Sequence, residues 1–151
     1  MKFNLKKFIF ILVVTFLIGS LFTFFTGTDI YNEIVKPPFA PKAIVFPIVW
    51  SIIYILMSIS LYQVLEENYE NDLSLFLYVI QLFFNSTWTL IFFGFKNFFV
   101  SFIWIMILIV CVIKMFIKFY QIKKSAGLLV IPYIIWLFIA LYLNIGIYIL
   151  N

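Results

Sequence analysis

The sequence predicts an all-α integral membrane protein, a bundle of five transmembrane helices. Of its 151 residues, 66% are hydrophobic and only 11% are charged, whereas a soluble domain is about 45–50% apolar. The apolar residues form five continuous runs, each close to the ~20 residues that a helix needs to cross a bilayer. A transmembrane β-barrel is excluded because these runs do not alternate between apolar and polar residues.

The five spans are expected at residues 8–25, 46–65, 73–93, 98–119 and 128–150. Each must be helical, because backbone groups in lipid have to bond within their own segment. No change in composition marks a second domain, so residues 1–151 are expected to form one membrane domain. Lys2, Lys6 and Lys7 before the first run are also typical of a secretory signal peptide. No small-residue cleavage site follows, so we expect a retained span.

The lysines predict the orientation of the bundle. Five spans place the two termini on opposite sides, and seven of the ten lysines lie on the side of the N-terminus: Lys2, Lys6, Lys7, Lys114, Lys118, Lys123 and Lys124. The positive-inside rule then predicts a cytoplasmic N-terminus and an external C-terminus. Residue usage rich in Ile, Phe, Asn and Lys, without arginine, is typical of an AT-rich bacterial genome, so the expected location is the bacterial inner (cytoplasmic) membrane.

Several classes of function lack their residues in this chain. There is no histidine and only one cysteine, Cys111, which excludes Ser-His-Asp and Cys-His catalysis and the common imidazole metal site. No acidic residue lies inside a predicted span, although proton-coupled transporters usually need one. The lysines flank the spans and form no basic face, so no nucleic-acid partner is expected. We expect no metal site and no required cofactor.

Three of the predicted helices carry a stripe that mixes aromatic with polar or small residues at helical spacing. The stripes are Trp50, Tyr54, Met57 and Leu61 on the second span; Gln81, Asn85, Trp88 and Phe92 on the third; and Tyr133, Trp136, Ala140 and Asn144 on the fifth. An amide in hydrocarbon needs hydrogen-bond partners, so Gln81, Asn85 and Asn144 should point inward. For any one of them, an interhelical hydrogen bond is the alternative. Their coincidence on three helices favours a shared aromatic pocket in the outer half of the membrane, whereas Trp104 lies outside the stripes.

The loop at residues 26–45 is expected to act as a lid over this pocket. It contains Pro37, Pro38 and Pro41, and prolines fix the backbone in extended geometry. A stiff, partly apolar loop could cover the pocket mouth. The alternative is a rigid spacer between the first two spans.

Three motifs resemble those of the tryptophan-rich sensory protein / translocator protein family, also called the peripheral benzodiazepine receptor family. The first is residues 46–57, Phe-Pro-Ile-Val-Trp-Ser-Ile-Ile-Tyr-Ile-Leu-Met, preceded by Lys36, Pro37 and Pro41. Residues 81–88, Gln-Leu-Phe-Phe-Asn-Ser-Thr-Trp, followed by Phe92 and Phe93, resemble the family's third-helix motif. Residues 132–140 with Leu143 and Asn144 resemble its fifth-helix motif. The resemblance covers nearly the whole chain in the right order.

This resemblance implies a five-helix bundle, commonly a homodimer, with a pocket for porphyrins such as protoporphyrin IX and haem and for isoquinoline carboxamides. The ligand-lining positions that it implies are Tyr31, Pro41, Trp50, Asn85, Trp88, Phe92, Trp136 and Ala140. Tyr54 and Asn144 join them from the stripes. Some bacterial members are associated with light-dependent porphyrin breakdown, and the catalytic residues of such an activity would be Trp50 and Trp136.

The chain departs from the family pattern at three points. Tyr31 stands where many members have tryptophan. The cholesterol motif of animal members is absent, because only Ile149, Leu150 and Asn151 follow Tyr148. Without histidine, haem would lack imidazole ligation, so a metal-free porphyrin suits the site better. We therefore expect a membrane receptor or sensor for porphyrins, with a light-dependent porphyrin-degrading enzyme or a facilitative porphyrin transporter as alternatives.

Overall fold

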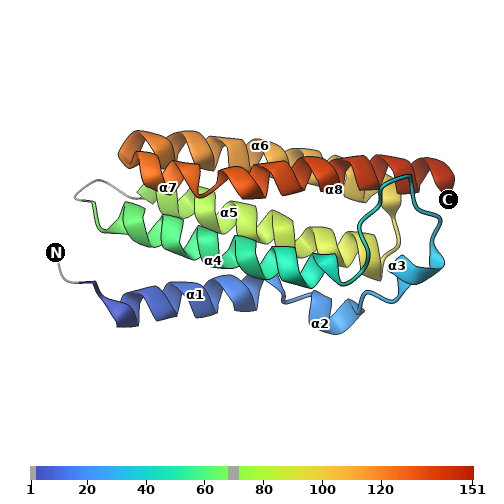
Figure 1. Cartoon of the computed structure of the whole chain (residues 1–151), viewed down its shortest axis with the longest axis horizontal. Helices are drawn as coiled ribbons and strands as arrows, with labels where there is room; N and C mark the ends of the chain where they lie inside the picture. Colours follow the sequence, from blue (N-terminus) through green and yellow to red (C-terminus); the bar gives the residue numbers. More distant parts are fainter. Residues whose placement is uncertain (1–2, 68–71) are drawn as a thin grey trace.

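The computed structural model describes residues 3–67 and 72–151, and these residues form helices and connections without a strand. In chain order the elements are α1 (Leu5–Gly19), α2 (Thr23–Thr26), α3 (Ile30–Glu33), α4 (Val45–Leu65), α5 (Asp72–Thr89), the π-helix η1 (Leu90–Gly94), α6 (Phe98–Ile122), α7 (Lys124–Leu128) and α8 (Ile131–Leu150) (Figure 1). The predicted all-α fold is confirmed.

Five helical segments of the described chain are long and apolar enough to cross a bilayer: Leu5–Thr26, Val45–Leu65, Asp72–Gly94, Phe98–Ile122 and Lys124–Leu150. They correspond one to one with the five expected spans. The first, fourth and fifth are longer than expected by a few residues at one or both ends. Polar residues account for these extensions, because Asn4 caps the start of α1 by accepting from the Lys7 N–H, and lysines near a span end can reach the interface.

Two of the spans are broken, which the apolar pattern did not predict. The first span bends between Gly19 and Thr23, where Ser20 Oγ donates to the Phe16 carbonyl at 2.6 Å; such back-bonding often bends helices. The fifth span turns at residues 129–130, just before Pro132 in the first turn of α8. Proline has no N–H to continue the preceding helix, and it is favoured at the start of the next one.

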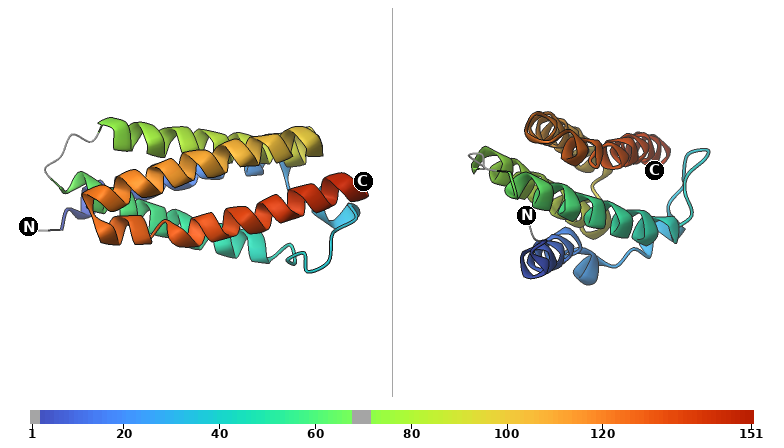
Figure 2. Two further views of the ribbon diagram at one scale, coloured as in Figure 1. Left: turned by 90° about the horizontal axis from the view of Figure 1, so that it is seen from above. Right: turned by 60° about the vertical axis from the view of Figure 1, so that its left-hand side comes forward.

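The helices are arranged in three layers. Figure 1 shows α1 on one side, α4 and α5 in the middle, and α6 with α8 on the other side, and the right-hand view of Figure 2 shows the same order. Contacts agree with this arrangement, since α1 packs on α4 and α5, and α6 packs on α5 and α8. Large aromatic side chains fill the space between α4 and α8, where Phe46 meets Trp136 and Trp50 meets Tyr133.

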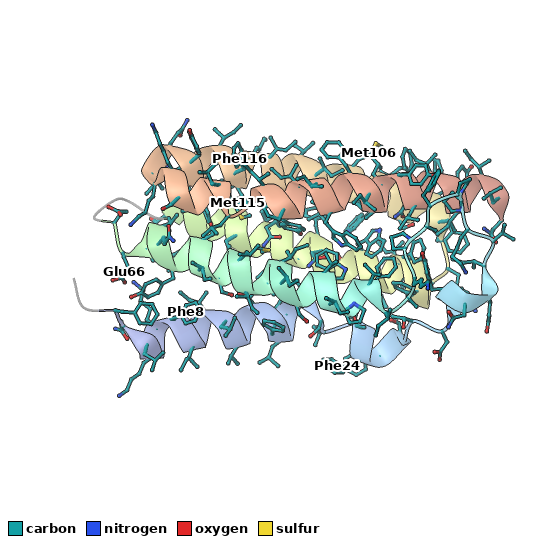
Figure 3. All side chains as sticks on the ribbon, in the orientation of Figure 1. Phe8, Phe24, Glu66, Met106, Met115 and Phe116 are labelled. Atoms are coloured by element: carbon teal, nitrogen blue, oxygen red, sulfur yellow. The ribbon has the colours of Figure 1, made fainter. Side chains whose placement is uncertain are left out.

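The segments that the lysines placed on one side of the membrane lie together at one end of the bundle. Lys7 Nζ lies 2.6 Å from Glu66 Oε1, and Lys123 Nζ lies 2.8 Å from Glu67 Oε1. Figure 3 shows Glu66 near the start of α1. Lys2 lies outside the described residues. The start of α1, the end of α4 and the start of α7 therefore share one end, opposite to the C-terminus.

Large apolar side chains cover the outside of the bundle. Phe24 on α2 is 81% exposed, and Figure 3 shows it projecting away from the helices. Phe10 on α1, Phe76 on α5 and Phe138 on α8 are also exposed. A surface of this kind is stable only when hydrocarbon covers it, as expected for an integral membrane protein.

The loop between α2 and α4 is tied to the end of α8. Tyr142 Oη donates to the Pro38 carbonyl at 2.7 Å, and Asn151 Nδ2 donates to the Val35 carbonyl at 2.9 Å. Gly146 permits a close approach, because a Cβ there would lie 2.5 Å from Pro37 Cγ. The proline-containing stretch therefore lies on α8, and only the two ends of the loop reach the cavity described below.

Candidate ligand-binding site

A cavity of about 470 Å³ lies between α1, α2, α4 and α5 at the end of the bundle that carries the loop. Its walls are largely aromatic, with seven rings: Phe16, Tyr31, Phe46, Trp50, Tyr54, Trp88 and Phe93. Five hydroxyl side chains also line it: Ser20, Thr23, Thr28, Ser51 and Thr89. Within the part of the chain that the structure describes, no charged side chain lines this cavity. Its volume is in the range of about 300–1,000 Å³ typical of small-molecule pockets.

Tyr54 is held in the cavity wall by two neighbours. Asn85 Nδ2 donates to Tyr54 Oη at 3.1 Å. On the other side the ring lies against Gly19, where a Cβ would be only 2.5 Å from Tyr54 Cζ. Asn85 itself is 2% exposed and does not line the cavity. In the structure its amide therefore positions Tyr54.

Tyr31, on the short helix α3, is fixed by contacts within the loop. Its hydroxyl donates to the Pro41 carbonyl at 2.8 Å. Lys36 Nζ donates to the Tyr31 carbonyl at 2.7 Å and lies 4.9 Å from the ring centroid. A tyrosine hydroxyl is protonated and able to donate at neutral pH, and burial raises the pKa of Tyr31 further above its ordinary value. Pro41 and Lys36 thus act on the site through Tyr31.

A second, much smaller cavity of about 10 Å³ lies behind the first, toward α8. It shares four lining residues with the main cavity, Tyr31, Phe46, Trp88 and Phe93, and reaches Phe92, Ala140, Leu143, Asn144 and Ile147. We call the four shared rings the partition. The π-helix η1 follows Trp88 and places Phe93 along both cavities and Phe92 along the small one. Such π-turns are frequent at functional sites.

Asn144 lies on the small cavity with its amide already engaged. Its Oδ1 accepts from Trp88 Nε1 at 3.3 Å and from Ser101 Oγ at 2.9 Å. Its Nδ2 donates to the Ala140 carbonyl at 2.8 Å. The Asn144 side chain joins α8 to α5 and α6. This is the interhelical hydrogen bonding that the sequence left open as an alternative to a role in ligand binding.

Trp136 lies behind the partition. Its ring centroid is 5.5 Å from that of Phe46 in an edge-on contact, and it lines neither cavity. The residue is 6% exposed, and its indole N–H has no hydrogen-bond partner among residues 3–67 and 72–151. By contrast, the half-exposed Trp104 donates to Thr87 Oγ1 at 2.9 Å on the far side of α5.

The ten residues predicted from the sequence therefore fall into three groups. Tyr31, Trp50, Tyr54 and Trp88 line the main cavity. Phe92, Ala140 and Asn144 line the small one. Pro41, Asn85 and Trp136 line neither, and each contacts a residue of the main wall.

Phe16 and Phe46 were missed by the sequence reasoning, although a signal for each was present. Phe46 precedes Trp50 by four residues, so the stripe of the second span extends back one turn to it. Phe16 lies four and seven residues before Ser20 and Thr23, which also line the cavity. This face of the first helix is apolar except for hydroxyls, so its pattern did not stand out.

Comparisons with known proteins agree with the fold and with the motifs. The TspO/MBR family matches residues 8–150. A protein of Chlorobaculum tepidum named "Tryptophan-rich protein TspO" is 34% identical over 136 residues, 88% of this chain and 86% of the relative. "Protein CrtK" of Rhodobacter capsulatus is 32% identical over 88% of this chain and 85% of its own length. A protein of Archaeoglobus fulgidus, also named "Tryptophan-rich protein TspO", is 32% identical over 98% of this chain and 99% of its own length. This chain is an integral membrane protein and belongs to the TspO/MBR family.

Proposed function

We propose that the protein is a membrane receptor that binds a porphyrin, such as protoporphyrin IX, in the aromatic cavity between α1, α2, α4 and α5. The observation that carries the proposal is the cavity itself, about 470 Å³ in volume and walled by seven aromatic rings without a charged side chain among the described residues. Large planar π-systems pack favourably on indole and phenol rings. The hydroxyl groups of the lining supply hydrogen bonds to the edge of the ligand.

A titration of the purified protein with protoporphyrin IX in the dark tests this function. Trp50 and Trp88 line the cavity, so a bound porphyrin should quench tryptophan fluorescence in a saturable manner. Free N-acetyl-tryptophanamide gives the loss of signal that light absorption alone causes. A Trp104→Phe variant, altered outside the cavity, should retain the saturable quenching. Quenching no larger than that of the free amide would refute porphyrin binding.

A light-dependent porphyrin-degrading enzyme is the second candidate function. One observation favours it, because Trp50 brings an oxidisable indole to the cavity surface. Its ring is also 5.6 Å from Tyr54 and 5.8 Å from Tyr133, so further oxidisable side chains lie behind it. Appearance of a porphyrin product under illumination would separate the enzyme from the receptor. Porphyrin uptake into vesicles would separate a facilitative transporter from both.

We further propose that the N-terminus lies in the cytoplasm and the C-terminus outside, in the bacterial inner membrane. The end of the bundle with Lys7 and Lys123 carries most of the lysines of the described chain, and lysine-rich ends stay on the cytoplasmic side. Alkaline phosphatase, which is active only outside the cytoplasm, should be active when fused to the C-terminus and inactive when fused to the N-terminus. The reverse pattern would contradict the orientation.

A further inference from the structure

We propose that the outward face of α6 binds an anionic phospholipid, such as phosphatidylglycerol, at the lysine-rich end of the bundle. Lys114 and Lys118 bind its phosphate, and the apolar residues that precede them contact one of its acyl chains. This lipid site and the aromatic cavity lie at opposite ends of the bundle. The inference therefore goes beyond the proposed porphyrin function and does not depend on it.

The first argument is the pattern of the α6 surface, which belongs to an outer layer of the bundle (Figure 1). The exposed residues that share this face at helical spacing are Ile103, Ile107, Val110, Lys114, Ile117 and Gln121. The partly exposed Lys118 lies beside them, one turn after Lys114. The face is therefore apolar as far as Val110, and from Lys114 onward it presents cationic and amide groups. A phospholipid has the same order of acyl chain and charged headgroup.

The apolar part of this face also matches one leaflet of a bilayer in length. Ile103 and Lys114 lie ~16 Å apart along the helix axis. The hydrocarbon of one leaflet is ~15 Å thick, half of the ~30 Å core of a bilayer. An acyl chain that lies along Ile103, Ile107 and Val110 therefore brings the lipid phosphate to the level of the two lysines.

The second argument is the position of Lys114 within the span. It lies ~12 Å along the axis before Ile122, the last residue of α6. Side chains on a helix point back toward its N-terminus, and α6 begins at the other end of the bundle, directly after η1. The stem of Lys114 therefore starts toward the middle of the bilayer, where a charge is costly without a partner. By bending back, its ammonium group reaches the level of the lipid phosphates.

The third argument is the balance of charge at this end of the bundle. Glu66 is paired with Lys7, and Glu67 is paired with Lys123. Lys114 forms no ion pair within residues 3–67 and 72–151. Lys118 is its neighbour at i+4, and like charges at this spacing repel each other. A lipid phosphate between the two lysines offsets this repulsion and offers acceptor oxygens to both.

A lipid titration tests the site. Delipidated protein in an uncharged detergent is titrated with phosphatidylglycerol, and native mass spectrometry measures the fraction that carries one lipid. The unaltered protein should bind phosphatidylglycerol more tightly than phosphatidylcholine with the same acyl chains. The double variant Lys114→Gln, Lys118→Gln should bind it about tenfold more weakly, whereas Lys114→Arg, Lys118→Arg keeps both charges and should retain it. Equal affinity of the unaltered protein for the two lipids would overturn the proposal.

The matched control is the double variant Lys6→Gln, Lys124→Gln. Lys6 and Lys124 are exposed at the same end of the bundle but lie on α1 and α7. The control therefore removes the same charge from the same leaflet and leaves α6 unchanged, so its affinity for phosphatidylglycerol should equal that of the unaltered protein. An equal loss in both double variants would indicate diffuse attraction to the lysine-rich end and overturn a site on α6. Since none of these lysines is buried, all variants should unfold at the same SDS concentration as the unaltered protein.

Two further measurements distinguish the lipid from other occupants of this face. Added inorganic phosphate should leave phosphatidylglycerol bound; complete displacement by phosphate would mean that the lysines bind the free anion, and the lipid proposal would be wrong. The mass spectrum also gives the oligomeric state, which should be the same in the unaltered protein and in Lys114→Gln, Lys118→Gln. A changed oligomeric state with unchanged lipid affinity would show that a second copy of the chain covers this face instead of a lipid.

Discussion

A Gly19→Val variant should lose about 2–6 kcal/mol of its free energy of unfolding and most of its porphyrin affinity. The new Cβ would lie 2.5 Å from Tyr54 Cζ and 2.7 Å from Tyr54 Oη, so the Tyr54 ring has to move. Moving it breaks the 3.1 Å hydrogen bond from Asn85 and leaves a buried amide unsatisfied. Overpacking costs about 1–3 kcal/mol, and an unsatisfied buried polar group costs about the same again. Unfolding by SDS in mixed micelles measures the loss.

Two further variants separate the causes of this effect. Tyr54→Phe keeps the ring and removes only the hydroxyl, so it should show the hydrogen-bond part of the loss, about 1–3 kcal/mol. Val13→Leu adds a methylene on an exposed face of the same helix and should be nearly neutral. If Gly19→Val unfolds at the same SDS concentration as the unaltered protein, α1 is not packed against Tyr54.

The five spans could be predicted because bilayer thickness dictates the length of a span, and the length of each continuous apolar run can be read directly from the sequence. The breaks within spans could not be predicted from apolarity, since they depend on single residues that interrupt the main-chain hydrogen bonds. Ser20 and Pro132 were visible as residues, but hydroxyls and prolines also occur in unbroken transmembrane helices. Tertiary contacts, such as the close approach of Gly19 to Tyr54, decide where a helix bends.

The sequence predicted the lining face of each helix separately, but it did not predict how these faces pack against one another in the candidate site. Helical spacing identifies the face that carries Trp50 and Tyr54, and both line the main cavity. Helical spacing does not say which residue of a neighbouring helix lies between a predicted side chain and the cavity. Phe46 separates Trp136 from the cavity because α4 and α8 meet through large side chains at this level. In the same way, the amide of Asn144 could not be assigned to Trp88 and Ser101 before their positions were known.

Trp50→Ala should reduce porphyrin affinity about thirtyfold, or about 2 kcal/mol, the size of loss found when a central tryptophan is removed from an interface. The indole of Trp50 lines the cavity. Its ring lies 5.6 Å from Tyr54 of the same wall and 5.8 Å from Tyr133 behind it. Trp104→Ala is the matched control, because Trp104 lies at the α5–α6 contact, beside Phe84 and Thr87. The two variants should differ in dissociation constant when titrated in the dark. Equal affinities would place the porphyrin outside this cavity.

Illumination then distinguishes the receptor from the enzyme with the milder variants Trp50→Phe and Trp136→Phe. Phenylalanine keeps an aromatic surface, so Trp50→Phe should bind in the dark with a loss of about 1 kcal/mol or less, but it removes the more easily oxidised indole. An enzyme that uses these tryptophans should stop forming porphyrin product in the light in both variants, while Trp104→Phe continues. A receptor should form no protein-dependent product in any of them. Product formation that survives in both Trp50→Phe and Trp136→Phe would show that neither indole is required by itself, and it would direct attention to Trp88, which also lines the cavity.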